Sequence, residues 1–85
     1  MTEITLESKQ ELTMEIKAKE LYLIHNCKVV QNQSDSYLWI GEKELNSENR
    51  GLILMNSELY IAEEPTDVYI LSHYSDITVW LRGGE

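Results

Sequence analysis

The feature that most constrains the fold is the alternation of apolar and polar residues in ELTMEIKAKE, residues 11–20. Apolar residues occupy the even positions from Leu12 to Ala18, and polar or charged residues occupy the odd ones. A period of two is typical of a β-strand with one face in water. A helix is the competing interpretation, because Ser8 and Glu11 have the spacing of a capping box. Helical spacing gives a poorer apolar stripe, so the alternation predicts a strand.

The rest of the chain divides into short β-prone segments separated by residues that favour turns. Residues 17–20 predict a tight turn or bulge, because the apolar parity reverses at Leu21. A polar loop is expected over residues 25–36, and a longer charged connection over residues 42–51. The predicted strands cover residues 11–16, 21–24, 37–40, 52–55, 58–63, 67–71 and 76–81.

Strands at this spacing predict an all-β fold, namely a small antiparallel β-sandwich or barrel of about 7–8 short strands. We expect a single domain over residues 1–85, with residues 1–10 as a candidate N-terminal arm. A chain of 85 residues buries one compact core and leaves little room for a deep active site. Its size therefore argues against an enzyme.

The charge of the chain limits its partners. Fifteen acidic residues against seven basic ones give a net charge of −8, which repels phosphate backbones and argues against nucleic acid. No apolar run exceeds four residues, so no membrane partner is expected. Cys27 is the only cysteine, which excludes an intrachain disulfide and fits a small buried apolar residue.

The segment ITVWLRGGE, residues 77–85, contains the Leu-Arg-Gly-Gly sequence that closes ubiquitin. Ile77, Val79 and Leu81 alternate with Thr78 and Trp80, which predicts a last β-strand. The long amphipathic helix that ubiquitin needs after its first hairpin would fall after Ile16, where a helix is conceivable but no uncluttered polar face is present. A strand is therefore the preferred interpretation, and a conjugation tail the alternative.

Few residues suggest chemistry. The candidate zinc ligands are His25, Cys27 and the distant His73. Structural zinc sites, however, usually draw four ligands from paired motifs. A nucleophilic Cys27 with His73 as its general base would lack a third group to orient the histidine. The carboxylate pairs at Glu42 with Glu44 and at residues 63–64 are typical of solvated charges. We therefore expect no catalytic residue, metal or cofactor.

Aromatic residues are the candidates for partner contacts. Five tyrosines and two tryptophans occur without a phenylalanine, and such rings suit both core packing and protein interfaces. We expect the exposed loop from residue 42 to residue 50 to adjust these contacts. The predicted partner-binding residues are Tyr37, Trp39, Tyr69, Trp80, Glu42, Glu44 and Arg50.

The order of these segments resembles small tailed-phage virion proteins of β-sandwich type, which decorate capsids or complete heads. The likeness covers most of the chain after Glu11 and is a matter of pattern. It rests on Asn26 after the second strand, the displayed strand at residues 37–40, the glycine and apolar pair that open residues 51–57, and the last two strands. Asn56-Ser57 departs from the glycine-containing turn of such proteins.

The resemblance implies a non-enzymatic structural or assembly component of a phage virion, assembled in the host cytoplasm. It would bind a capsid or tail protein and form a homo-oligomer through sheet edges and aromatic patches. The alternative is a small acidic inhibitor that occupies a basic surface of a host protein. Such an inhibitor should gather its acids on one face, whereas acidic residues here run from Glu3 to Glu85.

Overall fold

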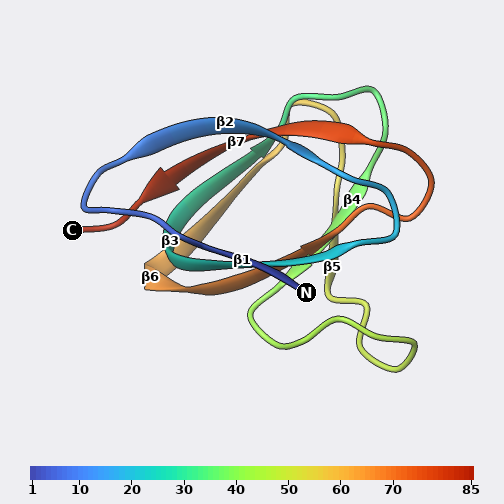
Figure 1. Cartoon of the computed structure of the whole chain (residues 1–85), viewed down its shortest axis with the longest axis horizontal. Coiled ribbons are helices and arrows are strands. Elements are labelled where there is room, and N and C mark those ends of the chain that lie inside the picture. Colours follow the sequence, from blue (N-terminus) through green and yellow to red (C-terminus); the bar gives the residue numbers. More distant parts are fainter.

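The chain folds into a single curled β-sheet. A computed structural model describes all 85 residues and contains seven strands and no helix. The strand order is β2-β7-β3-β6-β4-β5, and β1 pairs with β3 in parallel while all other neighbours are antiparallel. The sheet curls into a half-barrel (Figure 1), which confirms the predicted all-β class. The strands are β1 (Thr2–Thr5), β2 (Glu11–Ile16), β3 (Leu21–Asn32), β4 (Leu38–Gly41), β5 (Leu52–Leu54), β6 (Leu59–Leu71) and β7 (Ile77–Gly83).

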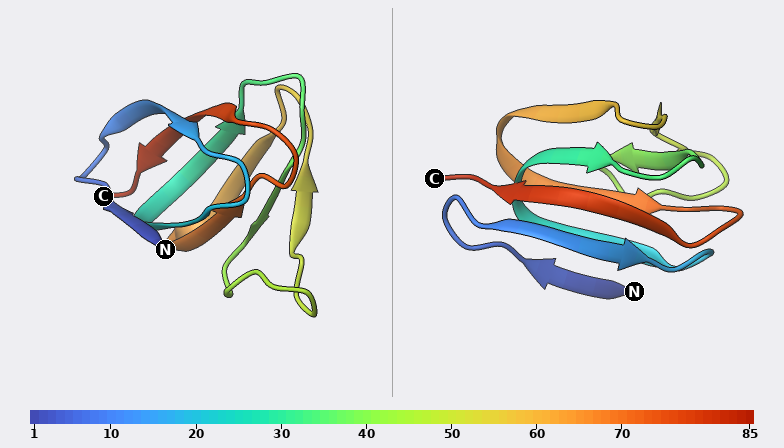
Figure 2. Two further views of the ribbon diagram at one scale, coloured as in Figure 1. Left: turned by 45° about the vertical axis from the view of Figure 1, so that its right-hand side comes forward. Right: turned by 90° about the horizontal axis from the view of Figure 1, so that it is seen from above.

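β3 is a long bent strand that belongs to both walls of the half-barrel (Figure 2). Its first half lies between β1 and the second half of β6, and its second half lies between β7 and the first half of β6. The register shifts on both sides of Cys27, and Asn26 has a positive φ of 57°. The loop predicted over residues 25–36 is therefore wrong as far as Asn32, because a bulge carries the polar residues within a continuous strand.

β6 also bends, and it replaces two separate strands that the sequence predicts on either side of the Glu-Pro-Thr segment. Residues 62–65 lie opposite Lys28 alone, so this corner of the strand has no regular ladder. The Lys28 ammonium donates to the carbonyls of Ala62 at 2.5 Å and Glu63 at 2.7 Å, which supplies bonds that the ladder does not. Pro65 is tolerated because a proline cannot donate a ladder bond and none is required there.

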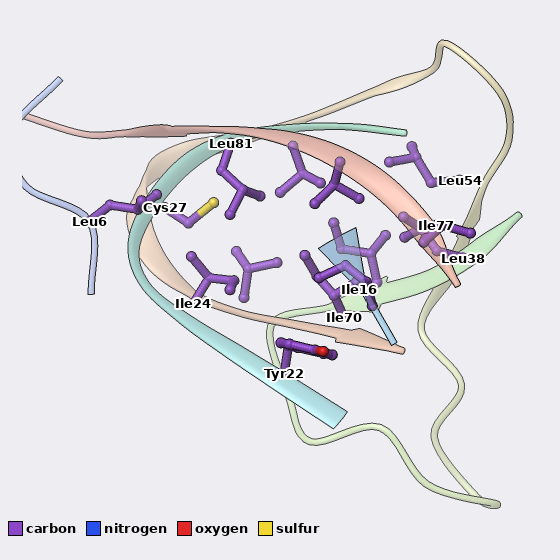
Figure 3. Close-up of a cluster of buried hydrophobic side chains, with 14 residues drawn as sticks. Leu6, Ile16, Tyr22, Ile24, Cys27, Leu38, Leu54, Ile70, Ile77 and Leu81 are labelled. Carbon is purple, nitrogen blue, oxygen red and sulfur yellow. The ribbon is translucent and has the colours of Figure 1, made fainter. Parts of the chain in front are cut away.

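The hydrophobic core fills the inside of the curl. Alternate residues of each strand point inward, as the sequence predicts for residues 11–16 and 77–81, and Figure 3 shows these side chains between the two walls. Ile16 is fully buried at the end of β2, where the alternation ends in the turn. The core comprises Leu6, Ile16, Tyr22, Ile24, Cys27, Val30, Leu38, Ile40, Leu54, Val68, Ile70, Ile77, Val79 and Leu81.

Within the first ten residues, β1 joins the sheet and Leu6 enters the core, so this segment is not a free arm. β1 pairs with β3, and Leu6 is only 2% exposed within the core. The amide of Leu6 donates to the carbonyl of His25 at 3.1 Å, and the Asn26 side-chain amide donates to the carbonyl of Leu6 at 3.0 Å. Polar residues surround Leu6 in the sequence, so local composition does not indicate that this residue is buried.

Gly83 and Gly84 are both buried at the end of β7. The Gly83 amide donates to the carbonyl of Gln10 at 2.7 Å, and the Gly84 amide donates to the carbonyl of Asn26 at 3.1 Å. The Gly84 carbonyl accepts from the amide of Lys9 at 2.7 Å. The diglycine is therefore fixed between the β1–β2 turn and the bulge of β3, and the predicted last strand is confirmed.

Candidate protein-binding surface

Four rings and a guanidinium meet at one end of the sheet, and we call Tyr37, Trp39, Arg50, His73 and Tyr74 the aromatic cluster. Tyr37 precedes β4 and Trp39 lies within it. Arg50 lies near the end of the connection from β4 to β5, and His73 and Tyr74 lie in the turn from β6 to β7. Neighbouring β4 residues fill the core, so the period of two turns Trp39 to the outer face. Three segments distant in sequence thus build one surface.

The members of the cluster contact one another in a chain. The Trp39 and His73 rings are stacked, with centroids 4.5 Å apart and an interplanar angle of 28°. The Arg50 guanidinium carbon lies 5.1 Å from the Trp39 ring centroid, within cation–π range. Tyr74 meets His73 edge to face at 5.5 Å and Tyr37 at 5.8 Å. These contacts hold the aromatic side chains in defined positions.

The cluster runs from a buried anchor to an exposed tip. Trp39 is 9% exposed, whereas Tyr74 is 71% exposed. The neighbouring Tyr74 hydroxyl raises the pKa of Tyr37 above its usual value. Ile53 pairs with Trp39 across β4 and β5 and is 57% exposed, so an apolar margin adjoins the rings.

The structure brings together three of the predicted partner-binding residues, Tyr37, Trp39 and Arg50, and separates the others. Tyr69 lies half-buried on the outer face of β6, opposite Gly41 of β4. Trp80 lies half-buried on β7 between β2 and β3, with β3 and β6 between it and β4. Neither belongs to the aromatic cluster.

The connection from β4 to β5 carries the remaining predicted residues. Glu42 accepts a hydrogen bond from the Tyr60 hydroxyl. Burial is the larger cause and this bond the next that raise the pKa of Tyr60 to about 12. Glu44 is exposed, and its carbonyl accepts from the Asn49 side chain at 3.0 Å. Leu45 is only 4% exposed and anchors the connection. Glu42 therefore faces β6 and not the aromatic cluster.

His73 and Tyr74 were not among the predicted partner-binding residues. Their available signal was the His-Tyr pair between two predicted strands, in a turn where an aromatic side chain has no core to enter. The stacking of His73 on Trp39 depends on the pairing of β4 with β6, which brings Trp39 opposite Leu71. Local sequence holds no information on that pairing.

The residues considered for metal or nucleophilic chemistry do not meet. His25 lies on the outer face of β3, Cys27 lies in the core, and His73 belongs to the aromatic cluster. Burial raises the pKa of the Cys27 thiol to about 12, which disfavours the reactive thiolate. No group of three or more histidine, cysteine, aspartate or glutamate side chains is placed to hold a metal ion.

His25 instead links three strands through ion pairs. Its Nε2 lies 2.8 Å from a Glu3 carboxylate oxygen on β1, and its Nδ1 lies 2.8 Å from an Asp67 carboxylate oxygen on β6. Carboxylates only accept, so both ring nitrogens donate when the imidazole is protonated. These bonds to Glu3 and then Asp67 raise the pKa of His25. Protonation of His25 thus strengthens the attachment of β1.

Comparison of the chain with models of known protein families, with curated proteins and with solved structures found no significant match. The structure holds no helix capable of spanning a membrane. The candidate surface is therefore interpreted from its own geometry.

Proposed function

We propose that the protein is a non-enzymatic assembly component that associates with its own copies and with a protein partner through the aromatic cluster. The observation that supports this most is the contact chain from Arg50 through Trp39 and His73 to the exposed Tyr74. Tryptophan, tyrosine and arginine are the residue types most enriched at interface hot spots. Because the rings already hold one another in place, little side-chain entropy is lost on binding.

The strand beside the cluster supports self-association. β5 is the last strand in the order of the sheet, so one of its edges has no neighbour. Leu52, Ile53 and Met55 are each more than half exposed along or just after this strand. An exposed edge with apolar side chains is a template for pairing with another chain. A contact centred on Tyr74 and Ile53 would cover both the rings and this apolar strand.

We propose a phage virion as the setting, with a capsid or tail protein as the partner and assembly in the host cytoplasm. This part rests on the resemblance of the strand segments to small virion proteins. The distribution of acidic residues favours it over the inhibitor alternative. Glu3 and Asp67 flank His25, Asp76 contacts Lys17 at the β2–β3 turn, and a third group of acids, Glu42, Glu63 and Glu64, lines a hollow beside β6, so acids occur at several separate places.

The test is the solution mass of the purified protein, measured by light scattering on a sizing column at two concentrations. We expect an oligomer, and we expect Tyr74→Ala and Arg50→Ala to shift it toward the monomer. Truncation of a hot-spot side chain costs about 2 kcal/mol, or roughly thirtyfold in the dissociation constant. Arg82→Ala is the matched control, because Arg82 is exposed on β7 outside the cluster.

The thermal unfolding midpoint of each variant shows whether the change is one of assembly or of stability. Tyr74 is 71% exposed, so its removal should leave the midpoint of the monomer almost unchanged. A wild-type monomer at both concentrations would refute self-association. An oligomer that loses mass equally in Arg82→Ala would refute the assignment of the contact to the aromatic cluster.

A further inference from the structure

The first half of β6 has a strand on one side only. β3 pairs with Leu59, Tyr60 and Ile61, whereas β4 pairs only with the end of β6, at residues 69–71. In the right-hand view of Figure 2 this half of β6 forms the upper margin of the molecule, with no strand beyond it. An edge strand presents unpaired N–H and C=O groups to its surroundings. We call the unpaired side of residues 59–64 the β6 edge.

A surface hollow follows the β6 edge. It has a volume of about 430 Å³, and its lining includes Glu42, Ile61, Glu63 and Glu64. A second hollow of about 400 Å³ is lined by Glu42 and Tyr60 and reaches Leu52 at the start of β5. Because Glu42 lines both, the two hollows adjoin between β6 and the β4–β5 connection. An extended chain needs such an open path beside the strand that it joins.

The side chains of this region alternate in a manner suited to an added strand. Leu59 is 51% exposed and Ile61 is 62% exposed, and both lie on the outer face of β6, while Ala62 points into the core. Apolar side chains on an added strand would continue this exposed row. Burial of such cross-strand pairs is the main source of sheet stabilisation.

The charge at the β6 edge selects among possible occupants. Glu42, Glu63 and Glu64 line the first hollow, and no basic residue does. Lys43 lines the second hollow, and Lys28 already donates to the backbone carbonyls of Ala62 and Glu63. A second copy of the chain would bring another net charge of −8 to this surface. The carboxylates therefore repel a second copy and attract a basic segment.

We propose that the β6 edge binds an extended basic segment of another protein, in which lysine or arginine alternates with apolar residues. The segment adds as a strand beside residues 59–64 and forms main-chain hydrogen bonds with β6. Its basic side chains face Glu42 and Glu64 on the side of β6 that carries Tyr60, and its apolar side chains extend the row of Leu59 and Ile61 on the other side. This surface contains no residue of the aromatic cluster, and it meets the proposed self-association surface only at Leu52.

The probe is a capped synthetic peptide in which lysine alternates with valine, titrated into the ¹⁵N-labelled protein. We expect amide shift changes concentrated at residues 59–64 and a binding constant that weakens as salt is added. A peptide with glutamate in place of lysine should not bind. A peptide in which every second backbone amide is N-methylated keeps its charge but loses half of its backbone N–H donors. It should bind at least about tenfold more weakly.

Matched variants separate local charge from net charge. Glu63→Gln with Glu64→Gln should weaken the lysine peptide by about three- to tenfold, the range of exposed ion pairs. Glu7→Gln with Glu11→Gln removes the same charge from exposed residues elsewhere and should have little effect. Shifts concentrated away from residues 59–64 and the adjoining Glu42, equal binding of the N-methylated peptide, or equal losses in the two double variants would overturn the proposal. Absence of binding would overturn it as well.

Discussion

Replacing Gly84 with alanine tests whether the diglycine is as closely packed as the structure places it. A Cβ on Gly84 would fall well inside van der Waals contact with the ring of Pro65, and 3.2 Å from the Asn26 side-chain oxygen. Overpacking of a closed site costs about 1–3 kcal/mol, and alanine recovers about 0.4–1 kcal/mol by restricting the unfolded chain. We therefore expect Gly84→Ala to destabilise the fold by about 0.5–2.5 kcal/mol. For a domain of this size that lowers the melting temperature by roughly 2–20 °C.

The assay is urea unfolding followed by tryptophan fluorescence, in the wild-type and Pro65→Gly backgrounds. Removal of the Pro65 ring takes away the atoms that a Cβ on Gly84 would meet, so Gly84→Ala should cost little or become stabilising there. Gly83→Ala is different, because its Cβ would meet the backbone carbonyl of Glu7. No side-chain truncation relieves that contact, so its cost should be the same in both backgrounds.

Gly41→Ala is the control for a tolerated glycine. Its nearest neighbour would be the end of the Leu45 side chain at 3.3 Å, which needs to move by only a few tenths of an ångström, so a change within about 0.5 kcal/mol is expected. If Gly84→Ala left the stability unchanged, or if Pro65→Gly failed to reduce its cost, the close packing of the diglycine would be refuted.

Three further predictions concern ionisable groups. The pKa of His25 is raised from 6.5 in the folded protein, so the stabilisation by its carboxylate partners is complete below pH 6.5 and is lost as pH rises through the folded pKa. The urea midpoint should fall over this pH range, and His25→Gln should abolish this pH dependence. The Ala18 amide lowers the pKa of Asp76 from 3.8. The stabilisation by this hydrogen bond is therefore present above pH 3.8 and is lost as pH falls through the lower folded pKa, and Asp76→Asn should remove this acid dependence of the urea midpoint. Cys27 is fully buried with a pKa of about 12, so a thiol reagent should modify it only as fast as the protein unfolds, and rapid modification of the native protein would contradict its burial.

The strands with regular alternation were predictable because the cause of the pattern is local. In β2 and β7 every second residue meets the core, so Ile16 and Ile77 mark the buried face without knowledge of the partners. The continuity of β3 is not evident from the sequence. The register shifts around Cys27 move the inward-facing residues from even positions to an odd one and back to even ones. β6 continues through Pro65 because Lys28, more than thirty residues earlier, satisfies the carbonyls at the bend.

The candidate surface was predictable only in part for a similar reason. Composition identifies Trp39 and Arg50 as suited to an interface, but the arrangement of the cluster depends on which strands become neighbours. The sheet order places Trp80 on the far side of β3 and β6, although its sequence context resembles that of Trp39. Residue type therefore indicated the chemistry of the surface, and topology determined its membership.

The position of β7 between β2 and β3 has a consequence for biosynthesis. β2 and β3 leave the ribosome well before β7, yet each needs β7 as its hydrogen-bonded neighbour. Until β7 has been made, both strands expose an edge, and the core lacks Ile77, Val79 and Leu81. The sheet then cannot close until β7 has left the ribosome, and the slow closure expected of non-local β pairing leaves an interval in which chaperones can bind.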